Sequence, residues 1–168
     1  TRAPRIVDVG SGKGYLTFAL HEHLTKQLAK TPTTRGIESN AALAAKCNAI
    51  ATACGHAGLS FEAALAEHHA PGSIDILIAL HACDTATDDA IFQGIAGNAA
   101  LIITAPCCQH ELAPQLEKPA NALRGLTKFG LFKQRQADLV TDAARCLLLE
   151  ASGYRVKVIE FTSTEHTA

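Results

Sequence analysis

The sequence predicts an α/β fold in which a mostly parallel sheet carries helices on both faces. Short apolar runs alternate with longer segments whose apolar residues recur at helical spacing, as is typical of successive βα units. A glycine-rich loop joins the first expected strand to the first expected helix, a common ligand-binding arrangement. No repeat or internal linker interrupts the chain, so we expect one domain over residues 1–168.

The apolar runs place the expected elements in order along the chain. Strands are expected at 5–9, 34–38, 59–63, 74–80, 99–105 and 154–162. Helices are expected at 15–28, between Ser39 or Asn40 and Gly55, at 84–96, and from a cap at Thr141 or Asp142 to Leu149. Prolines and glycines break the pattern over 108–135, which receives no assignment.

Bulk composition limits the possible functions. The net charge is −1, so the strongly basic footprint of many nucleic-acid-binding proteins is absent, although RNA remains open as a substrate. The six cysteines form no dense framework, which favours reduced thiols and a cytoplasmic location. No apolar run approaches the roughly 18 residues of a membrane span, and we expect no membrane partner. The chain starts at Thr1 and contains no Met, so we expect a fragment of a longer protein.

The glycine loop, residues 8–14, carries the strongest local signal. Its pattern is an acidic residue, Asp8, followed by alternating glycines at 10, 12 and 14. A dinucleotide-binding loop would have glycine at Tyr15, and a P-loop would have Ser or Thr at Gly14. The pattern that remains resembles the first motif of class I S-adenosylmethionine-dependent methyltransferases. A tight strand-to-helix turn without a ligand is the alternative.

Acidic residues end the next two expected strands. Glu38 follows Gly14 by 24 residues and can accept hydrogen bonds from both ribose hydroxyls, as in dinucleotide-binding folds. Glu62 is expected either to reach the adenine amine or to be a solvated strand end. Together with the loops described below, we expect cofactor contacts from Asp8, Gly10, Ser11, Gly12, Lys13, Gly14, Glu38, Ser39, Glu62, Ala63, Leu80 and His81.

Two polar loops follow the fourth and fifth expected strands, where open parallel sheets bind ligands. The first reads His-x-Cys-x-x-Ala-Thr-Asp over 81–88, and the second reads Pro-Cys-Cys over 106–108. The pair resembles the methyltransferase group that contains the glutathione-S-transferase C-terminal-domain-containing methyltransferase-like proteins. It is also similar to the eukaryotic tRNA 2′-O-methyltransferases. Thr141-Asp142-x-x-Arg145 and the segment 160–167 resemble later motifs of the first group.

The resemblance implies a Rossmann-like class I methyltransferase sheet whose final strand is truncated at Ala168. It also implies S-adenosylmethionine as the cofactor and S-adenosylhomocysteine as its product. From it we expect a methyltransferase that acts on RNA. A protein or small-molecule acceptor, and a non-catalytic S-adenosylmethionine-binding interaction module, remain as alternatives, and the oligomeric state stays open.

The loop residues offer several kinds of chemistry. His81 and Asp84 can position or deprotonate an acceptor, although Asp84 can equally cap its helix and His81 can bond to backbone. Cys107 is the third catalytic candidate, either as a covalent nucleophile or as small buried packing. A zinc site among His81, Cys83, Cys107, Cys108 and His110 would lack a CxxC pair, so we expect no metal.

Overall fold

The computed structural model describes residues 3–68, 72–80, 82–106, 109–117 and 124–159. Within them, five strands form one parallel sheet in the order β3-β2-β1-β4-β5. The strands are β1 (Arg5–Val9), β2 (Thr33–Glu38), β3 (Leu59–Ala63), β4 (Ile76–Ala79) and β5 (Leu101–Thr104). The predicted α/β class is therefore confirmed. The order reverses between β1 and β4, which is where such sheets place their ligand crevice.

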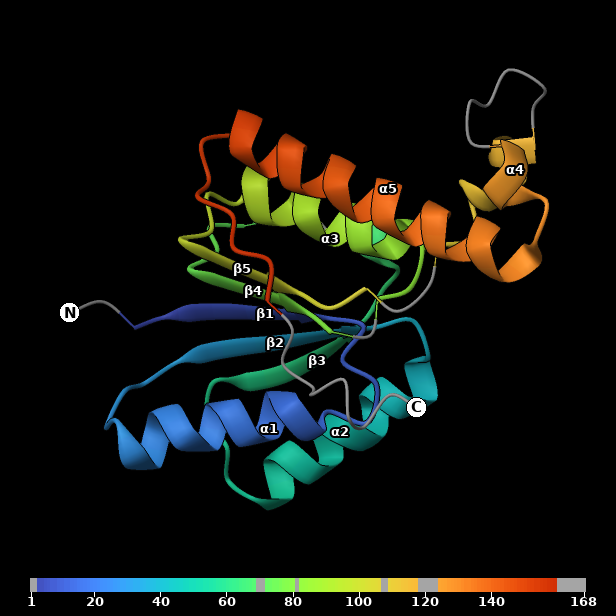
Figure 1. Ribbon diagram of the computed structural model, residues 1–168. Helices are drawn as coiled ribbons and strands as arrows, with labels where there is room; N and C mark the ends of the chain where they lie inside the picture. The colour runs from blue at the N-terminus through green and yellow to red at the C-terminus, as the bar shows by residue number, and fades with distance from the viewer. Residues whose placement is uncertain (1–2, 69–71, 81, 107–108, 118–123, 160–168) are drawn as a thin grey trace.

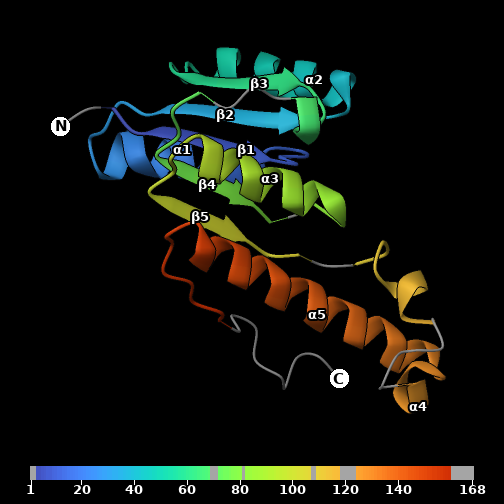
Figure 2. The same cartoon turned by 90° about the horizontal axis from the view of Figure 1, so that it is seen from above.

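Helices cover both faces of the sheet, as predicted (Figure 1). One face carries α1 (Tyr15–Glu22), which continues into the π-helical turn η1 (His23–Gln27), and α2 (Ala41–Ala53). The other carries α3 (Thr85–Ala96) and α5 (Gly130–Ala151), which lies beside β5 when seen from above (Figure 2). Three short helices complete the described chain: η2 (Ala66–His68), η3 (Ala113–Glu117) and α4 (Arg124–Thr127). None of the described helices has the length and apolarity needed to cross a bilayer.

The core has one apolar cluster on each face of the sheet. Val7, Val9 and Leu77 of the central strands pack with Ala90 of α3 on one side. On the other side, the buried residues are Ala44, Cys47, Ala51, Leu59 and Phe61 of α2 and β3. The central strands β1 and β4 are covered on both faces and read as mostly apolar runs, which is why the sequence pattern located them well.

The last predicted helix was placed too late in the chain. Thr141 and Asp142 were expected to cap it, but both lie inside α5, which begins at Gly130. Glycine weakens a helix mainly in its interior, and here Gly130 is the first residue. The following Lys133, Gln134 and Arg135 are good helix formers. The glycine therefore marks the start of the helix and not a break.

The predicted last strand is wrong over its described part. Residues 154–159 have no strand assignment, and residues 160–162 lie outside the described residues. The Tyr154 hydroxyl instead donates to the carbonyl of Ala99, at 2.8 Å, which anchors the segment to the turn before β5. Val158 is 81% exposed. Alternating apolar residues favour a strand only where another strand pairs with them.

Candidate active site

The glycine loop is held at the carboxyl edge of the sheet by the end of the neighbouring strand. The backbone amides of Gly10 and Ser11 both donate to the carbonyl of Ile37, at 2.9 and 3.0 Å. Gly10, Gly12 and Gly14 have φ values of 72°, 55° and 74°. Residues other than glycine rarely adopt such positive φ values. The residue pattern therefore produces a loop whose backbone curls tightly over the ends of β1 and β2.

The glycines at 14 and 12 serve different purposes. A Cβ at Gly14 would lie 2.9 Å from the Phe61 ring, so this position is filled by the protein itself. A Cβ at Gly12 would find its nearest atom, the Gly10 carbonyl oxygen, 4.0 Å away. Unlike Gly14, Gly12 leaves open space on the loop, as a closely approaching cofactor would need.

Two buried side chains support the loop from beneath. Asp8 is 5% exposed, and its Oδ2 accepts a 2.6 Å hydrogen bond from the Thr17 hydroxyl of α1. Cys47 of α2 donates to the carbonyl of Gly12 across 3.8 Å. Burial raises the pKa of the Cys47 thiol, which keeps it a neutral donor. The predicted contact between Asp8 and the cofactor stays a prediction. The sequence pattern missed Thr17 and Cys47, because nothing local indicates that helix residues meet the loop.

Glu38 lies directly beside the glycine loop. Its Oε2 accepts the amide hydrogen of Gly12 at 2.9 Å. Its Oε1 accepts from the amide of Asn40 at 2.8 Å and from the Ser39 hydroxyl at 3.3 Å. The buried Ser11 hydroxyl has no hydrogen-bond partner among the described residues. A fixed carboxylate, an unsatisfied hydroxyl and the opening at Gly12 thus fit an adenosine-containing cofactor with a ribose.

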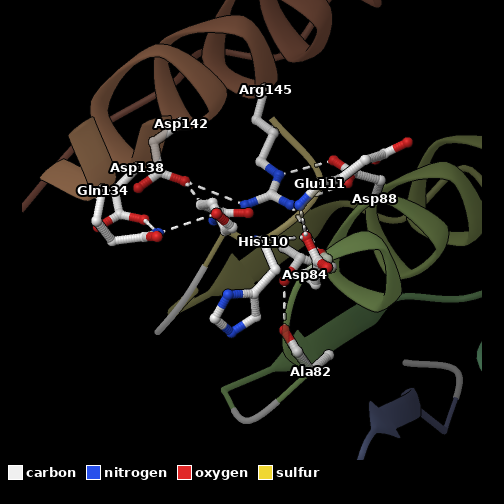
Figure 3. A network of polar contacts seen from close by, with 11 residues as sticks. Ala82, Asp84, Asp88, His110, Glu111, Gln134, Asp138, Asp142 and Arg145 are labelled. Atoms are coloured by element: carbon white, nitrogen blue, oxygen red, sulfur yellow. Dashed lines mark hydrogen bonds and ion pairs between the residues drawn. The ribbon is translucent and has the colours of Figure 1, made fainter. Parts of the chain in front are cut away.

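The loop after β4 approaches the loop after β5 through Asp84 (Figure 3). Asp84 Oδ1 accepts the amide hydrogens of His110 and Glu111, at 3.1 and 3.2 Å. Its side chain makes no capping hydrogen bond with α3. The alternative that Asp84 merely caps its own helix is therefore wrong. Its carboxylate binds the backbone of a second loop at the same edge of the sheet.

A family model described as a methyltransferase domain matches residues 1–115. This chain belongs to that methyltransferase domain family. The predicted enzyme class and its S-adenosylmethionine cofactor are confirmed at this level. A search of the curated proteins finds no match.

Solved structures similar to this methyltransferase domain are distant in sequence. The [4+2]-cyclase SpnF is 17% identical, with a TM-score of 0.45, over 56% of this chain and 35% of that chain. The N-terminal domain of EvdMO1, solved with S-adenosylhomocysteine, is 14% identical, with a TM-score of 0.46, over 61% and 40%. A methyltransferase from Thiobacillus denitrificans is 21% identical, with a TM-score of 0.37, over 47% and 30%. The chain thus spans less than half the length of these proteins.

The Glu38 carboxylate of this methyltransferase domain is expected to strengthen cofactor binding. Losing charged hydrogen bonds to the ribose costs about 1.5–3 kcal/mol. Glu38→Ala should therefore weaken S-adenosylmethionine binding by about tenfold or more in calorimetry. Glu22→Ala, which removes an exposed carboxylate paired with Lys26 on α1, is the control and should leave the dissociation constant unchanged. Equal affinities for the Glu38 variant and the wild type would place the ribose contact elsewhere.

The remaining predicted cofactor residues lie at the same edge. Ala63 is opposite Glu38 in the register between β2 and β3, and Leu80 directly follows β4. Lys13 is exposed on the glycine loop. Glu62 forms an ion pair with Arg35 at 3.7 Å, with both side chains about half exposed. Contacts between these residues and the cofactor stay predictions.

The chain beyond the matched residues 1–115 contributes a buried arginine to which the sequence pattern gave no role. The Arg145 side chain, on α5, is 6% exposed. It binds both oxygens of Asp88, at 2.7 and 2.9 Å, and Oδ1 of Asp142 at 3.1 Å. It also donates to the carbonyl of Asp84 at 2.9 Å. The sequence offered only a motif for Asp142 and Arg145, and no signal for Asp88 as their partner.

Burial and charge pairing oppose each other in this network. Burial lowers the pKa of Arg145, but the hydrogen bonds and charges of Asp88 and Asp142 outweigh it and raise the pKa overall. Burial raises the pKa of the Asp142 carboxyl, although Arg145 opposes that shift. Arg145 is therefore a cation at neutral pH.

Three of the predicted chemical residues, His81, Cys107 and Cys108, lie outside the described residues. The candidate roles of His81 and Cys107 in catalysis, and the expectation that these residues bind no zinc, stay predictions. Within the described ranges, no group of three or more His, Cys, Asp or Glu side chains is arranged to hold a metal ion. What the structure does place is the chain on either side: Leu80 and Ala82 around position 81, and Pro106 and Gln109 around positions 107–108.

Proposed function

We propose that this domain transfers a methyl group from S-adenosylmethionine to RNA. The observation that carries the proposal is the pairing of Glu38 with the Gly12 amide beside the open position of the glycine loop. The same edge carries the loops after β4 and β5, which Asp84 joins. RNA as the acceptor is supported by the similarity of these loops to those of the tRNA 2′-O-methyltransferases.

Bound at the glycine loop, the cofactor supplies a methyl group on a sulfonium, which needs little further activation. The protein must then align the acceptor and handle its proton. Glu38 and the glycine loop would orient the ribose and adenosine. His81 and Asp84 would position or deprotonate the acceptor, and Cys107 would line the same loop cluster. Covalent attack by Cys107 is the less favoured alternative.

A protein or small-molecule acceptor is the second candidate. The observation that favours it is the net charge of −1, since proteins that bind RNA over a large surface usually carry a basic footprint. A short RNA contact confined to the site loops would not require that footprint. Both candidate functions use the same cofactor and differ only in the acceptor, so an experiment must identify the acceptor.

The test is to incubate the full-length protein with methyl-labelled S-adenosylmethionine and separate pools of cellular RNA, protein and metabolites. We expect label in RNA that nuclease treatment releases. Label confined to protein or metabolites would replace RNA with that acceptor class. Saturable cofactor binding without labelling of any pool would indicate a non-catalytic binding module.

A further inference from the structure

Arg145 joins segments that are far apart in the sequence. Its guanidinium contacts the Asp84 carbonyl after β4, the Asp88 carboxylate of α3 and the Asp142 carboxylate of its own helix (Figure 3). Asp142 Oδ1 also accepts from the side-chain Nε2 of Gln109 at 3.3 Å, and Gln109 is 2% exposed. Arg145 thus contacts the loop after β4 directly and the loop after β5 through Asp142.

The backbone at the centre of this network is strained. Asp84 has φ 54° and ψ −131°, a combination rarely adopted by residues other than glycine. Such conformations persist only where surrounding contacts enforce them, and they cluster at functional sites. At Asp84 those contacts are the Arg145 guanidinium on its carbonyl and the amides of His110 and Glu111 on its carboxylate.

Stability alone is a poor reason for this arrangement. Moving the charges out of water costs about as much free energy as their pairing contributes. Apolar residues can therefore often replace a buried ion pair without loss of stability. The planar guanidinium group instead fixes an orientation, because its donors bind the Asp88 carboxylate at two points and the Asp84 carbonyl at a third. That geometry fixes the two loops relative to each other.

We propose that Arg145 is a positioning residue that locks the loops after β4 and β5 together at the carboxyl edge of the sheet. The proposal rests on the proposed function. His81 is three residues before Asp84, and Cys107 is two residues before Gln109. Consecutive Cα atoms are about 3.8 Å apart, so a shift at either attachment point is passed to these residues. Misplacement of about 1 Å can cost on the order of 100-fold in rate.

The test compares Arg145→Lys with Arg5→Lys in the full-length protein. Lysine keeps the charge but cannot bind Asp88 at two points and the Asp84 carbonyl together. Arg5 makes a similar two-point contact with Asp75 through its side chain, at 3.2 and 3.3 Å, but where β1 and β4 begin, at the opposite edge. Total cellular RNA, protein and metabolite pools serve as acceptors, with the pool that the wild type labels used for kinetics.

Arg145→Lys should lower kcat by about 10- to 100-fold, with little change in acceptor KM or in the calorimetric dissociation constant for S-adenosylmethionine. Arg5→Lys should leave kcat unchanged. Wild-type kcat in Arg145→Lys, or an equal loss of kcat and stability in both variants, would overturn the proposal.

Amide hydrogen exchange provides a readout that needs no acceptor. Exchange at His110 and Glu111 should rise in Arg145→Lys and not in Arg5→Lys, because these amides bond to Asp84. An unchanged exchange rate at these two amides, or a uniform rise in exchange along the chain, would overturn the proposed positioning role of Arg145. If the wild type labels no pool, the proposed function fails, and the exchange result alone decides the positioning role.

Discussion

Gly12→Ala is expected to abolish S-adenosylmethionine binding while leaving the domain folded. The added Cβ meets no protein atom closer than 4.0 Å, so it enters the space left for the cofactor. At φ 55° an alanine also costs about 1–2 kcal/mol of folding stability. A steric conflict of about 2.7 kcal/mol or more weakens binding at least 100-fold. Calorimetry with S-adenosylmethionine and with S-adenosylhomocysteine measures the loss.

Gly55→Ala is the matched control for backbone strain. Gly55 has φ 67°, and an added Cβ there meets nothing within 4 Å, yet it follows α2 at the other end of the sheet from the glycine loop. Both variants should lose similar stability in urea unfolding, but only Gly12→Ala should lose the cofactor. Full affinity in Gly12→Ala would remove the glycine loop as the binding site.

The sequence predicted the strand, glycine loop and helix at residues 5–22 because their signals are local. The three glycines need no distant partner to be recognised, since each φ above 50° is a property of that residue type in a strand-to-helix turn. The same holds for the Asn40 side chain, which caps α2 by accepting from the Leu43 amide. The central strands β1 and β4 were found because they are buried on both faces and therefore read as mostly apolar runs.

Features that depend on long-range contacts were missed. Arg145 meets Asp88 across 57 residues, and no spacing rule connects them. The segment 154–159 alternates like a strand, but pairing is decided by a neighbouring strand and not by the segment itself. The start of α5 was misplaced for a related reason: whether Gly130 breaks a helix or begins it depends on the residues around it.

Replacing His81 or Asp84 with alanine is expected to lower turnover and spare cofactor affinity. The cofactor site proposed above is formed mainly by the loops after β1 and β2, whereas these residues follow β4. Losing a general base costs about 10²–10⁴-fold in kcat. His81→Ala should fall in this range with an unchanged dissociation constant for S-adenosylmethionine, which is the signature of an interaction used only in the transition state. A loss of cofactor affinity as large as the loss of turnover would show that these residues bind the cofactor and would contradict the prediction.

Asp84→Asn separates positioning from proton transfer at the second residue. The amides of His110 and Glu111 both bond to Oδ1, and the amide oxygen of asparagine can accept the same two hydrogen bonds. Asparagine has nearly the same size and shape as aspartate, so the surrounding contacts that hold the backbone at φ 54° should still fit it. Because the visible contacts need only an acceptor oxygen, we expect Asp84→Asn to retain most of the turnover that Asp84→Ala loses. A loss as large as that of alanine, together with the disappearance of the acidic limb from the pH profile of kcat, would instead make Asp84 the general base.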